Sequence, residues 1–391
     1  MFEVQCLPVL LRRPQATRRR WRVAVVLTSA LTVAACAARP EAGHLSPVAA
    51  TETAGTRDVL VATTRSRDPR PGTLYSGERS ERLDYARIKV SIPTSHRVGE
   101  IEWPSRPPGD SRRDFTVQNA AYLPGEKAFV DALKAQLAAR PKGRRKVMIF
   151  IHGYNTAFAE AVYRTAQIAH DARSPAVPVL FTWASRGRIG QYIYDHNSAT
   201  VARDDLEHVI RLAFATGPEQ VNILAHSMGS WIAVEALRQI KISGRPPDMS
   251  RLGSIFLAAP DLDVDVFKSQ MRRFGRPRKP FYIVLSKDDK ALAVSDFIAG
   301  TRSRLGSYQN TDELTALGAV VIDMTQVKAA DPANHGKFAQ LAEVAPELQT
   351  VLEAGVGNRR DRAVKQQGAL RAVIALPISI LSAPGRVVED H

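Results

Sequence analysis

The chain has 391 residues, of which 45% are hydrophobic and 7% aromatic, and its formal net charge is +15 at pH 7. This length and apolar content exclude an intrinsically disordered chain and predict a sizeable core in one large domain or two ordinary ones. The positive charge favours anionic neighbours. Six arginines and one glutamate lie within residues 1–35, however, so removal of that segment would lower the charge by five, to +10.

Residues 1–35 have the organisation of a secretory signal peptide. A basic stretch, Arg18–Arg22, precedes the apolar stretch Val23–Ala34, which is shorter than the roughly 20 residues that a membrane-spanning helix needs. The apolar stretch runs into the sequence VAAC, which ends at Cys36 and resembles the lipobox of bacterial lipoproteins. That resemblance implies cleavage before Cys36 and lipidation of its thiol. The alternative is an ordinary signal peptide followed by a chance cysteine.

The two cysteines bear on the cellular compartment. They are Cys6 and Cys36, so cleavage before Cys36 would leave neither a disulfide nor a cysteine-based zinc site. We expect a protein of the bacterial cell envelope that faces the periplasm and is held at a membrane by the lipid on Cys36. Ala37, directly after that cysteine, favours the outer membrane over the inner one.

Composition then divides the rest of the chain. Residues 36–57, rich in Ala, Pro, Thr and Gly, are expected to form a flexible tether behind the lipidated cysteine. The main domain is expected over residues 58–360, beginning with an irregular β-rich portion in which strands are predicted at 58–64, 85–92 and 99–103. Residues 361–391 form a C-terminal tail. Its apolar segment 370–381 is too short to span a membrane, so we expect it to pack on the domain.

After Gly125 the sequence alternates regularly between strand and helix patterns. Apolar, β-branched runs predict strands at 147–151, 177–183, 221–225, 254–258, 281–285 and 320–324. Amphipathic stretches predict helices at 126–139, 157–172, 199–215, 228–241, after Asp263, and at 337–352. This alternation predicts an α/β fold with a mostly parallel sheet covered by helices on both faces.

Ligands bind beyond the carboxyl ends of the strands in an open parallel sheet, so the residues that follow each strand are the candidates for chemistry. They are His152-Gly153-Tyr154-Asn155, His226-Ser227-Met228-Gly229, Asp261, Asp288-Asp289 and, on a longer loop, His335.

The segment around Ser227 carries a nucleophile motif. Ala225-x-Ser227-x-Gly229 resembles the G-x-S-x-G elbow of α/β hydrolases, with alanine in place of the first glycine, and it joins a β-branched strand to an amphipathic helix. A serine, then an aspartate, then a histidine follow at strand ends in the order of that fold.

The chain resembles, over roughly residues 58–385, a bacterial α/β-hydrolase family that is esterase/lipase-like and of unknown function, domain-of-unknown-function family 900. The resemblance rests on VATTR (61–65), FIHGYN (150–155), TWAS (182–185) with Asp195, HSMG (226–229), APD (259–261), DKAL (289–292) and His335. It implies a serine hydrolase with an α/β-hydrolase fold, and it does not imply a substrate.

Chemistry assigns a role to each candidate. A serine hydroxyl needs a base to become nucleophilic, and His335 is the candidate base for Ser227. Asp289 is the candidate acid that would orient the imidazole, and both Asp288 and Asp261 remain alternatives to it. We expect Asp261 instead to cap the helix that follows. A mere helix cap is the alternative role for Ser227.

Two backbone N–H groups are expected to bind the oxyanion. One belongs to Met228, at the start of a helix, and the other to Tyr154 or, as the alternative, Asn155. His152 is expected to be structural, and His226 to point away from the site.

The sequence predicts neither a metal site nor a cofactor. Asp261-x-Asp263-x-Asp265 lacks the glycine and the distant glutamate of a calcium loop, and no H-E-x-x-H, Walker A or G-x-G-x-x-G pattern is found in the sequence. The basic clusters 142–146 and 272–279 are expected to be solvated faces and not a nucleic-acid groove.

The predicted function is hydrolysis of a carboxylic ester, either a small molecule or a lipid acyl ester, through an acyl-enzyme. Thioesterase, amidase and acyltransferase activities use the same machinery and remain alternatives. A catalytically idle fold that acts as an envelope interaction module is the alternative from another class of protein.

Overall fold

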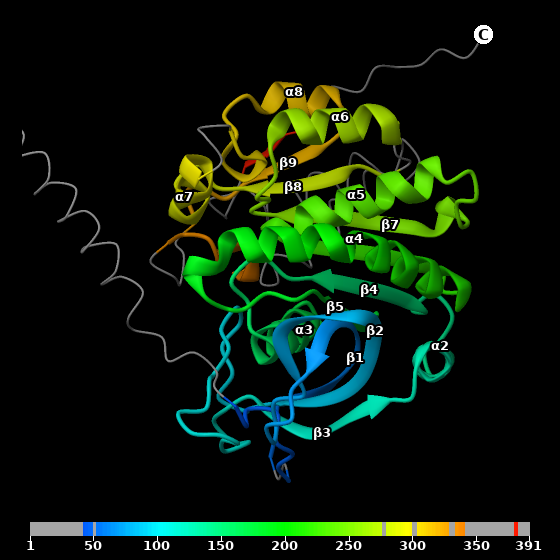
Figure 1. Ribbon diagram of the computed structural model, residues 1–391, viewed down its shortest axis with the longest axis vertical. Coiled ribbons are helices and arrows are strands. Elements are labelled where there is room, and N and C mark those ends of the chain that lie inside the picture. Colours follow the sequence, from blue (N-terminus) through cyan, green and yellow to red (C-terminus); the bar gives the residue numbers. More distant parts are fainter. Residues whose placement is uncertain are drawn as a thin grey trace, which may run out of the picture. The chain divides into compact units, whose positions relative to one another are not determined.

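A ten-stranded mixed sheet organises the chain (Figure 1). The computed structural model describes residues 42–49, 52–275, 279–298, 303–327, 333–340 and 379–381. The strands are β1 (Gly55–Arg67), β2 (Tyr75–Ile92), β3 (Thr116–Leu123), β4 (Lys146–Ile151), β5 (Val177–Thr182), β6 (Gln220–His226), β7 (Leu252–Ala258), β8 (Phe281–Leu285), β9 (Val320–Asp323) and β10 (Ser379–Leu381). Their order in the sheet is β10-β9-β8-β7-β6-β4-β5-β1-β2-β3.

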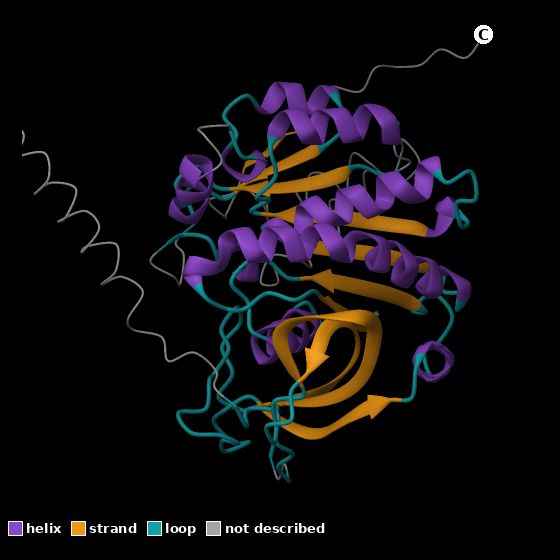
Figure 2. Ribbon diagram, viewed as in Figure 1, coloured by secondary structure: helices purple, strands orange, loops and turns teal. Residues whose placement is uncertain are grey.

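Helices connect the parallel strands (Figure 2). They are α2 (Glu126–Ala138), α3 (Phe158–Asp171), α4 (Tyr192–Ala215), α5 (Met228–Ile242), α6 (Val264–Phe274), α7 (Lys290–Ile298) and α8 (Thr311–Ala316). A short 3-10 turn, η1 (Ile189–Gln191), precedes α4. Another, η4 (Lys337–Gln340), follows the loop after β9. Neighbouring strands from β9 to β1 pair in parallel, and β2, β3 and β10 add antiparallel edges.

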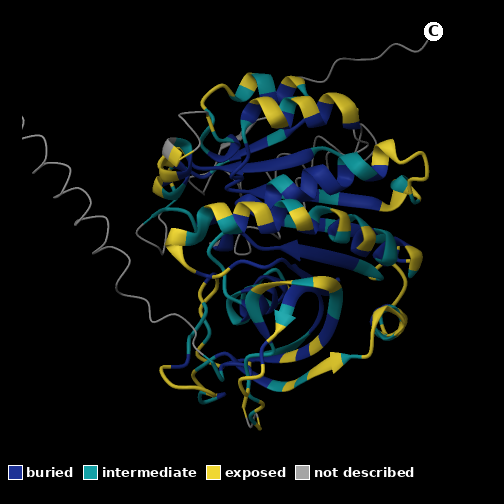
Figure 3. Ribbon diagram, viewed as in Figure 1, coloured by how far each residue is buried: buried dark blue, intermediate teal, exposed yellow. Residues whose placement is uncertain are grey.

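Both faces of the parallel part of the sheet are buried, as the apolar strands predict, whereas β2 and β3 carry exposed residues (Figure 3). Along β4, Val147, Ile149 and Ile151 join one core cluster, which also contains residues of α2, α4, α5 and α6. The alternate residues Met148 and Phe150 join a second cluster, which contains residues of α3. This period of two places successive side chains on opposite faces and explains why the strand is continuously apolar.

The order of the strands creates a ligand-binding edge. From β4 the chain passes to β5 on one side, while β6, β7 and β8 follow one another on the other side. The carboxyl ends of β4 and β6 therefore lie side by side where the direction of winding reverses, which is the usual binding position in such sheets.

Several local predictions differ from the structure. Residues 99–103 form a loop, and the third strand of the β-rich portion is β3, which the sequence analysis did not predict. Helix α4 begins at Tyr192, seven residues before the predicted start, because Tyr192 and Asp195 are held by tertiary hydrogen bonds that sequence periodicity does not report. Helices α7 and α8 were also not predicted, since each is short.

The N-terminal tether prediction is wrong for residues 42–49. Leu45 is buried, and the backbone N–H of Val48 donates to the Val117 carbonyl at 2.7 Å. The Tyr163 hydroxyl donates to the carbonyl of His44 at 2.6 Å. An apolar side chain and paired backbone groups attach this segment to the domain, although its composition is typical of a linker. Strand β1 likewise begins at Gly55, before the predicted domain boundary.

A buried ion cluster joins the end of α3 to the loop after β2. The two ring nitrogens of His96 donate to the carboxylates of Glu102 at 2.8 Å and Asp171 at 2.7 Å. Burial alone would lower the pKa of His96, but its hydrogen bonds to the two carboxylates outweigh burial and raise the pKa to about 9.

Three predictions lie mainly outside the described residues: the signal peptide at 1–35, the lipidated Cys36 and most of the tail at 361–391. The end of the apolar segment 370–381 is described, and it pairs with β9 as β10. Of the predicted helix at 337–352, only residues 337–340 are described, and they form the 3-10 turn η4. Among the described helices, none is both long and apolar enough to cross a membrane.

Candidate active site

Ser227 lies on a strained turn between β6 and α5. Its backbone has φ 52° and ψ −126°, which is costly for a residue with a side chain, by ~1–3 kcal/mol. Hydrogen bonds stabilise the turn: the Ser227 N–H donates to the Ala258 carbonyl, and the Ser227 carbonyl accepts from the Ser230 N–H, each at 2.9 Å. Ser227 occupies the N-cap position of α5, yet its side chain makes no capping hydrogen bond. The helix-cap alternative therefore has no support in this geometry.

Glycines allow the loop after β4 to touch the elbow. A Cβ atom at Gly153 would lie 2.7 Å from the Cβ of Ser227 and 2.9 Å from Nδ1 of His226. A Cβ atom at Gly229 would overlap the carbonyl oxygen of His152. The close approach of these two backbones explains why both positions carry no side chain.

His335 and Asp289 meet at the carboxyl edge of the sheet. The Nδ1 atom of His335 lies 2.7 Å from Oδ2 of Asp289, whose side chain is completely buried. The other carboxylate oxygen accepts from the N–H groups of Ala291 and Leu292, both at 3.0 Å, in the first turn of α7. The helix therefore holds one oxygen of Asp289 in place while the other faces the imidazole.

His226 connects this pair to the elbow. Its ring centroid lies 4.7 Å from that of His335 and 4.1 Å from that of Phe338, on η4. The expectation that His226 points away from the site is thus wrong, because η4 packs against its ring. Burial and the neighbouring His335 hold the pKa of His226 well below its usual value, so the ring is neutral.

Asp288 faces a different partner. Its two carboxylate oxygens accept from the ammonium of Lys337 at 2.7 and 2.9 Å. Lys337 is buried, and it also donates to the Ser286 hydroxyl and to the carbonyls of Met324 and Thr325. This lysine lies two residues after His335 and ties the histidine loop to the loop after β8, and it was not among the site residues predicted from the sequence.

Asp261 is also committed elsewhere. Its carboxylate accepts from the hydroxyls of Ser295 at 2.6 Å and Tyr192 at 3.1 Å, and it lies 3.3 Å from Nε of Arg304. The expectation that Asp261 caps the next helix is wrong: Asp263 does so, accepting from the N–H groups at the start of α6. The reason is that α6 begins at Val264, so the residue before it, Asp263, and not Asp261, occupies the N-cap position.

The two oxyanion candidates after β4 differ in their hydrogen bonds. The Asn155 N–H donates to Oδ2 of Asp195 at 3.1 Å, so it is already engaged. Tyr154 therefore stays the candidate on this loop, opposite Met228 in the first turn of α5, where backbone N–H groups have no acceptor within the helix. Tyr154 is held from outside as well, because its hydroxyl donates to the carbonyl of Ile189.

His152 lies behind this loop, as expected for a structural residue. It is buried, and its ring nitrogens lie 2.8 Å from the Gly153 carbonyl and the Thr182 hydroxyl. Burial, together with the nearby charge of Arg65, lowers its pKa to about 3, so the ring is neutral at any physiological pH.

This strand order, with Ser227 after β6, Asp289 after β8 and His335 after β9, is the arrangement of an α/β hydrolase. The model of the family described as "Alpha/beta hydrolase of unknown function (DUF900)" matches residues 126–354. The chain therefore belongs to this family, which confirms the predicted fold class and the resemblance.

Three solved structures resemble this chain, each at low sequence identity and with a TM-score below 0.5. Esterase B from Lactobacillus rhamnosis is 11% identical in an inhibited form, with 91% of this chain and 100% of that chain covered at a TM-score of 0.35. A second structure of that esterase is 10% identical, with coverages of 92% and 98% and a TM-score of 0.36. EstFA in its Fe-lacking apo form is 10% identical, with coverages of 84% and 90% and a TM-score of 0.33. A search of the curated proteins found no match.

Proposed function

We propose that this α/β hydrolase is a serine hydrolase that cleaves carboxylic esters, with Ser227 as nucleophile, His335 as base and Asp289 as acid. The observation that carries the proposal is the 2.7 Å contact between His335 and Asp289, together with the packing of His335 against His226, the residue before the strained Ser227. Strain at a non-glycine residue persists where the surrounding structure enforces it, and it gathers at functional sites. Neither Asp288 nor Asp261 has such a contact with a histidine among the described hydrogen bonds.

The reaction follows from these positions. As the Ser227 hydroxyl attacks the ester carbonyl carbon, Nε2 of His335 takes its proton, and the Asp289 carboxylate stabilises the imidazolium that forms. The N–H groups of Met228 and Tyr154 bind the oxyanion. When the tetrahedral intermediate collapses, His335 protonates the departing alcohol and the acyl group stays on Ser227. A water molecule then attacks the acyl-enzyme with His335 again as base, which releases the carboxylic acid.

A fluorophosphonate probe tests the nucleophile without a known substrate. The purified protein should become labelled, and Ser227→Ala should abolish labelling. Ser243→Ala, at the end of the same helix, is the matched control and should label like the wild type. Labelling that survives in Ser227→Ala would refute the assignment, and a wild type that never labels would refute the proposed class of enzyme.

The surroundings of the site favour an apolar group on the ester. Ile189, on η1, and Ile193, at the start of α4, are 59% and 64% exposed, and Val294 and Ile298, on α7, are 59% and 47% exposed. The two elements touch, because the Tyr192 hydroxyl lies 2.9 Å from the Ser295 hydroxyl. Both regions also adjoin the site. The Tyr154 hydroxyl donates a hydrogen bond to the carbonyl of Ile189 on η1, and the Asp289 carboxylate accepts from an N–H in the first turn of α7.

A panel of p-nitrophenyl esters of rising acyl length, with an amide of equal length, tests the substrate class. Since a fully buried methylene contributes ~0.8 kcal/mol, partial burial on these side chains should raise kcat/KM about twofold per methylene. Replacing Ile193 and Val294 by Ser should flatten the series. The same replacement at Val201 and Ile242, which are exposed elsewhere, should not. Faster cleavage of the amide than of the ester would instead assign an amidase.

A further inference from the structure

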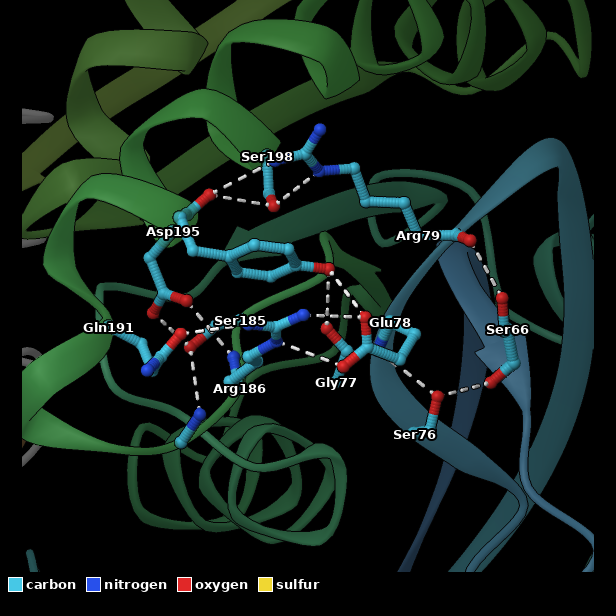
Figure 4. A network of polar contacts seen from close by, with 12 residues as sticks. Ser66, Ser76, Gly77, Glu78, Arg79, Ser185, Arg186, Gln191, Asp195 and Ser198 are labelled. Carbon is cyan, nitrogen blue, oxygen red and sulfur yellow. Dashed lines mark hydrogen bonds and ion pairs between the residues drawn. The ribbon is translucent and has the colours of Figure 1, made fainter.

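Asp195 is a buried carboxylate that the proposed reaction does not use. It lies in the first turn of α4, fully buried, and accepts three hydrogen bonds: from the Asn155 N–H at 3.1 Å, the Ser185 hydroxyl at 2.5 Å and the Arg186 N–H at 3.0 Å. Figure 4 shows Asp195 and Ser185 pointing toward one another. The donors come from two loops, which follow β4 and β5. One carboxylate therefore joins the loop that carries the oxyanion candidate to its neighbour.

A buried guanidinium joins the same two loops from the other side. Arg65, on β1, is fully buried and donates to the Thr156 carbonyl at 2.8 Å and to the Ser185 carbonyl at 2.7 Å. Burial lowers the pKa of Arg65 to about 10, and Asp195 opposes that shift, so the arginine is still charged at neutral pH. The two buried charges compensate one another across the loops, as buried charges must.

These contacts determine the direction of the peptide groups around Tyr154. The Gly153 carbonyl lies 2.8 Å from His152 Nδ1 and accepts from the Thr156 hydroxyl at 3.0 Å, so the N–H of Tyr154 points the opposite way across a planar trans peptide. The next N–H, of Asn155, is held by Asp195. Asn155 has φ 59°, in the left-handed region, which asparagine adopts more readily than most residues other than glycine. Its hydrogen bond to Asp195 fixes the peptide group in this conformation.

The N-terminal strands brace the first turn of α4 from outside (Figure 4). The Arg186 guanidinium donates to the Glu78 carboxylate at 2.9 Å, and its carbon lies 3.7 Å from the Tyr194 ring centroid. Arg79 donates to the Ser198 hydroxyl at 2.8 Å. Strand β2 thus holds the helix turn that carries Asp195, which gives the β-rich extension a place in the site.

We propose that Asp195 is a positioning residue of the oxyanion hole: by holding the Asn155 N–H it orients the loop so that the Tyr154 N–H faces the reacting carbonyl. The proposal rests on the proposed serine hydrolase. It predicts that Asp195 affects the transition state more than the ground state, because the oxyanion that the Tyr154 N–H would bind forms only in the transition state.

Asp195→Asn keeps the size of the side chain but leaves one acceptor for three donors. We expect the rate constant of fluorophosphonate labelling to fall about 10-fold, and about 100-fold in Asp195→Ala, close to the 10²–10³ that loss of one oxyanion donor costs. With an active ester, kcat should fall by a similar factor while KM changes less than threefold. The affinity for a trifluoromethyl ketone, which forms a tetrahedral adduct, should fall in parallel with kcat/KM.

Asp171→Asn is the matched control, since Asp171 is also a buried carboxylate with a backbone donor, the Gly99 N–H at 2.7 Å, but belongs to the His96 cluster. It should lower the melting temperature and leave kcat unchanged. If the Asp195 variants label and turn over like the wild type, or if Asp171→Asn lowers kcat as much at equal loss of stability, the positioning role is refuted. A wild type that neither labels nor cleaves esters would instead refute the proposed function.

Discussion

Asp289→Asn is the substitution whose outcome the geometry defines most sharply. One carboxylate oxygen of Asp289 accepts two N–H groups at the start of α7, and the other faces Nδ1 of His335. In the asparagine variant the amide oxygen will stay with the helix, because only an oxygen can accept there. The amide nitrogen will then face His335, which must present a bare Nδ1 and carry its proton on Nε2. That tautomer cannot take the proton of Ser227.

The expected loss in kcat is ~10⁴, the cost of the wrong imidazole tautomer in a Ser-His-Asp site, which corresponds to about 5 kcal/mol in the barrier. Asp288→Asn should cost less than about 10-fold. The Asp288 side chain is 41% exposed, and Lys337 keeps its bonds to the Ser286 hydroxyl and to the carbonyls of Met324 and Thr325 when the ion pair is lost.

Both variants should be compared with the wild type by the rate of fluorophosphonate labelling and by ester hydrolysis at one pH, with melting temperatures to show that each is folded. If Asp288→Asn lost activity while Asp289→Asn stayed active, Asp288 and not Asp289 would be the acid of the site. Equal and small effects in both would refute a role for either carboxylate as partner of His335.

Three other predictions follow from the structure. Gly153→Ala should reduce the rate of fluorophosphonate labelling at least 100-fold, since its Cβ would lie 2.7 Å from that of Ser227. Gly190→Ala, which has open space around its Cβ, should label at the wild-type rate. The free energy of unfolding should fall by ~1–2 kcal/mol between pH 6.5 and 9. The reason is that the raised pKa of His96 stabilises the folded state fully below pH 6.5, and this stabilisation is lost as the pH rises through about 9. In urea titrations, the free energy of unfolding of His96→Asn should not show this dependence on pH. For the lipid anchor that we propose at Cys36, Cys36→Ser should lose fatty-acid incorporation and sedimentation with membranes, and identical soluble fractions would refute it.

The sequence by itself determined the alternation of strands and helices and the position of the elbow. Buried parallel strands require continuous apolar runs, and the turn at Ser227 requires small neighbours such as Ala225 and Gly229, so both leave local signals. The chain order of serine, aspartate and histidine follows from the order of the strands. Local signals of this kind are carried by residues a few positions apart, which is why they can be recognised without tertiary structure.

Tertiary structure alone decided the direction of individual side chains. Asp288 and Asp289 are adjacent, and what separates their contacts is Lys337 and His335, which arrive on a loop more than 40 residues later. The same holds for Asn155, whose N–H is engaged by Asp195, 40 residues away. Residues 42–49 join the domain through a buried leucine in a segment with the composition of a linker. In each case the deciding partner is distant in sequence, and only packing of the whole chain brings it within hydrogen-bonding or van der Waals distance.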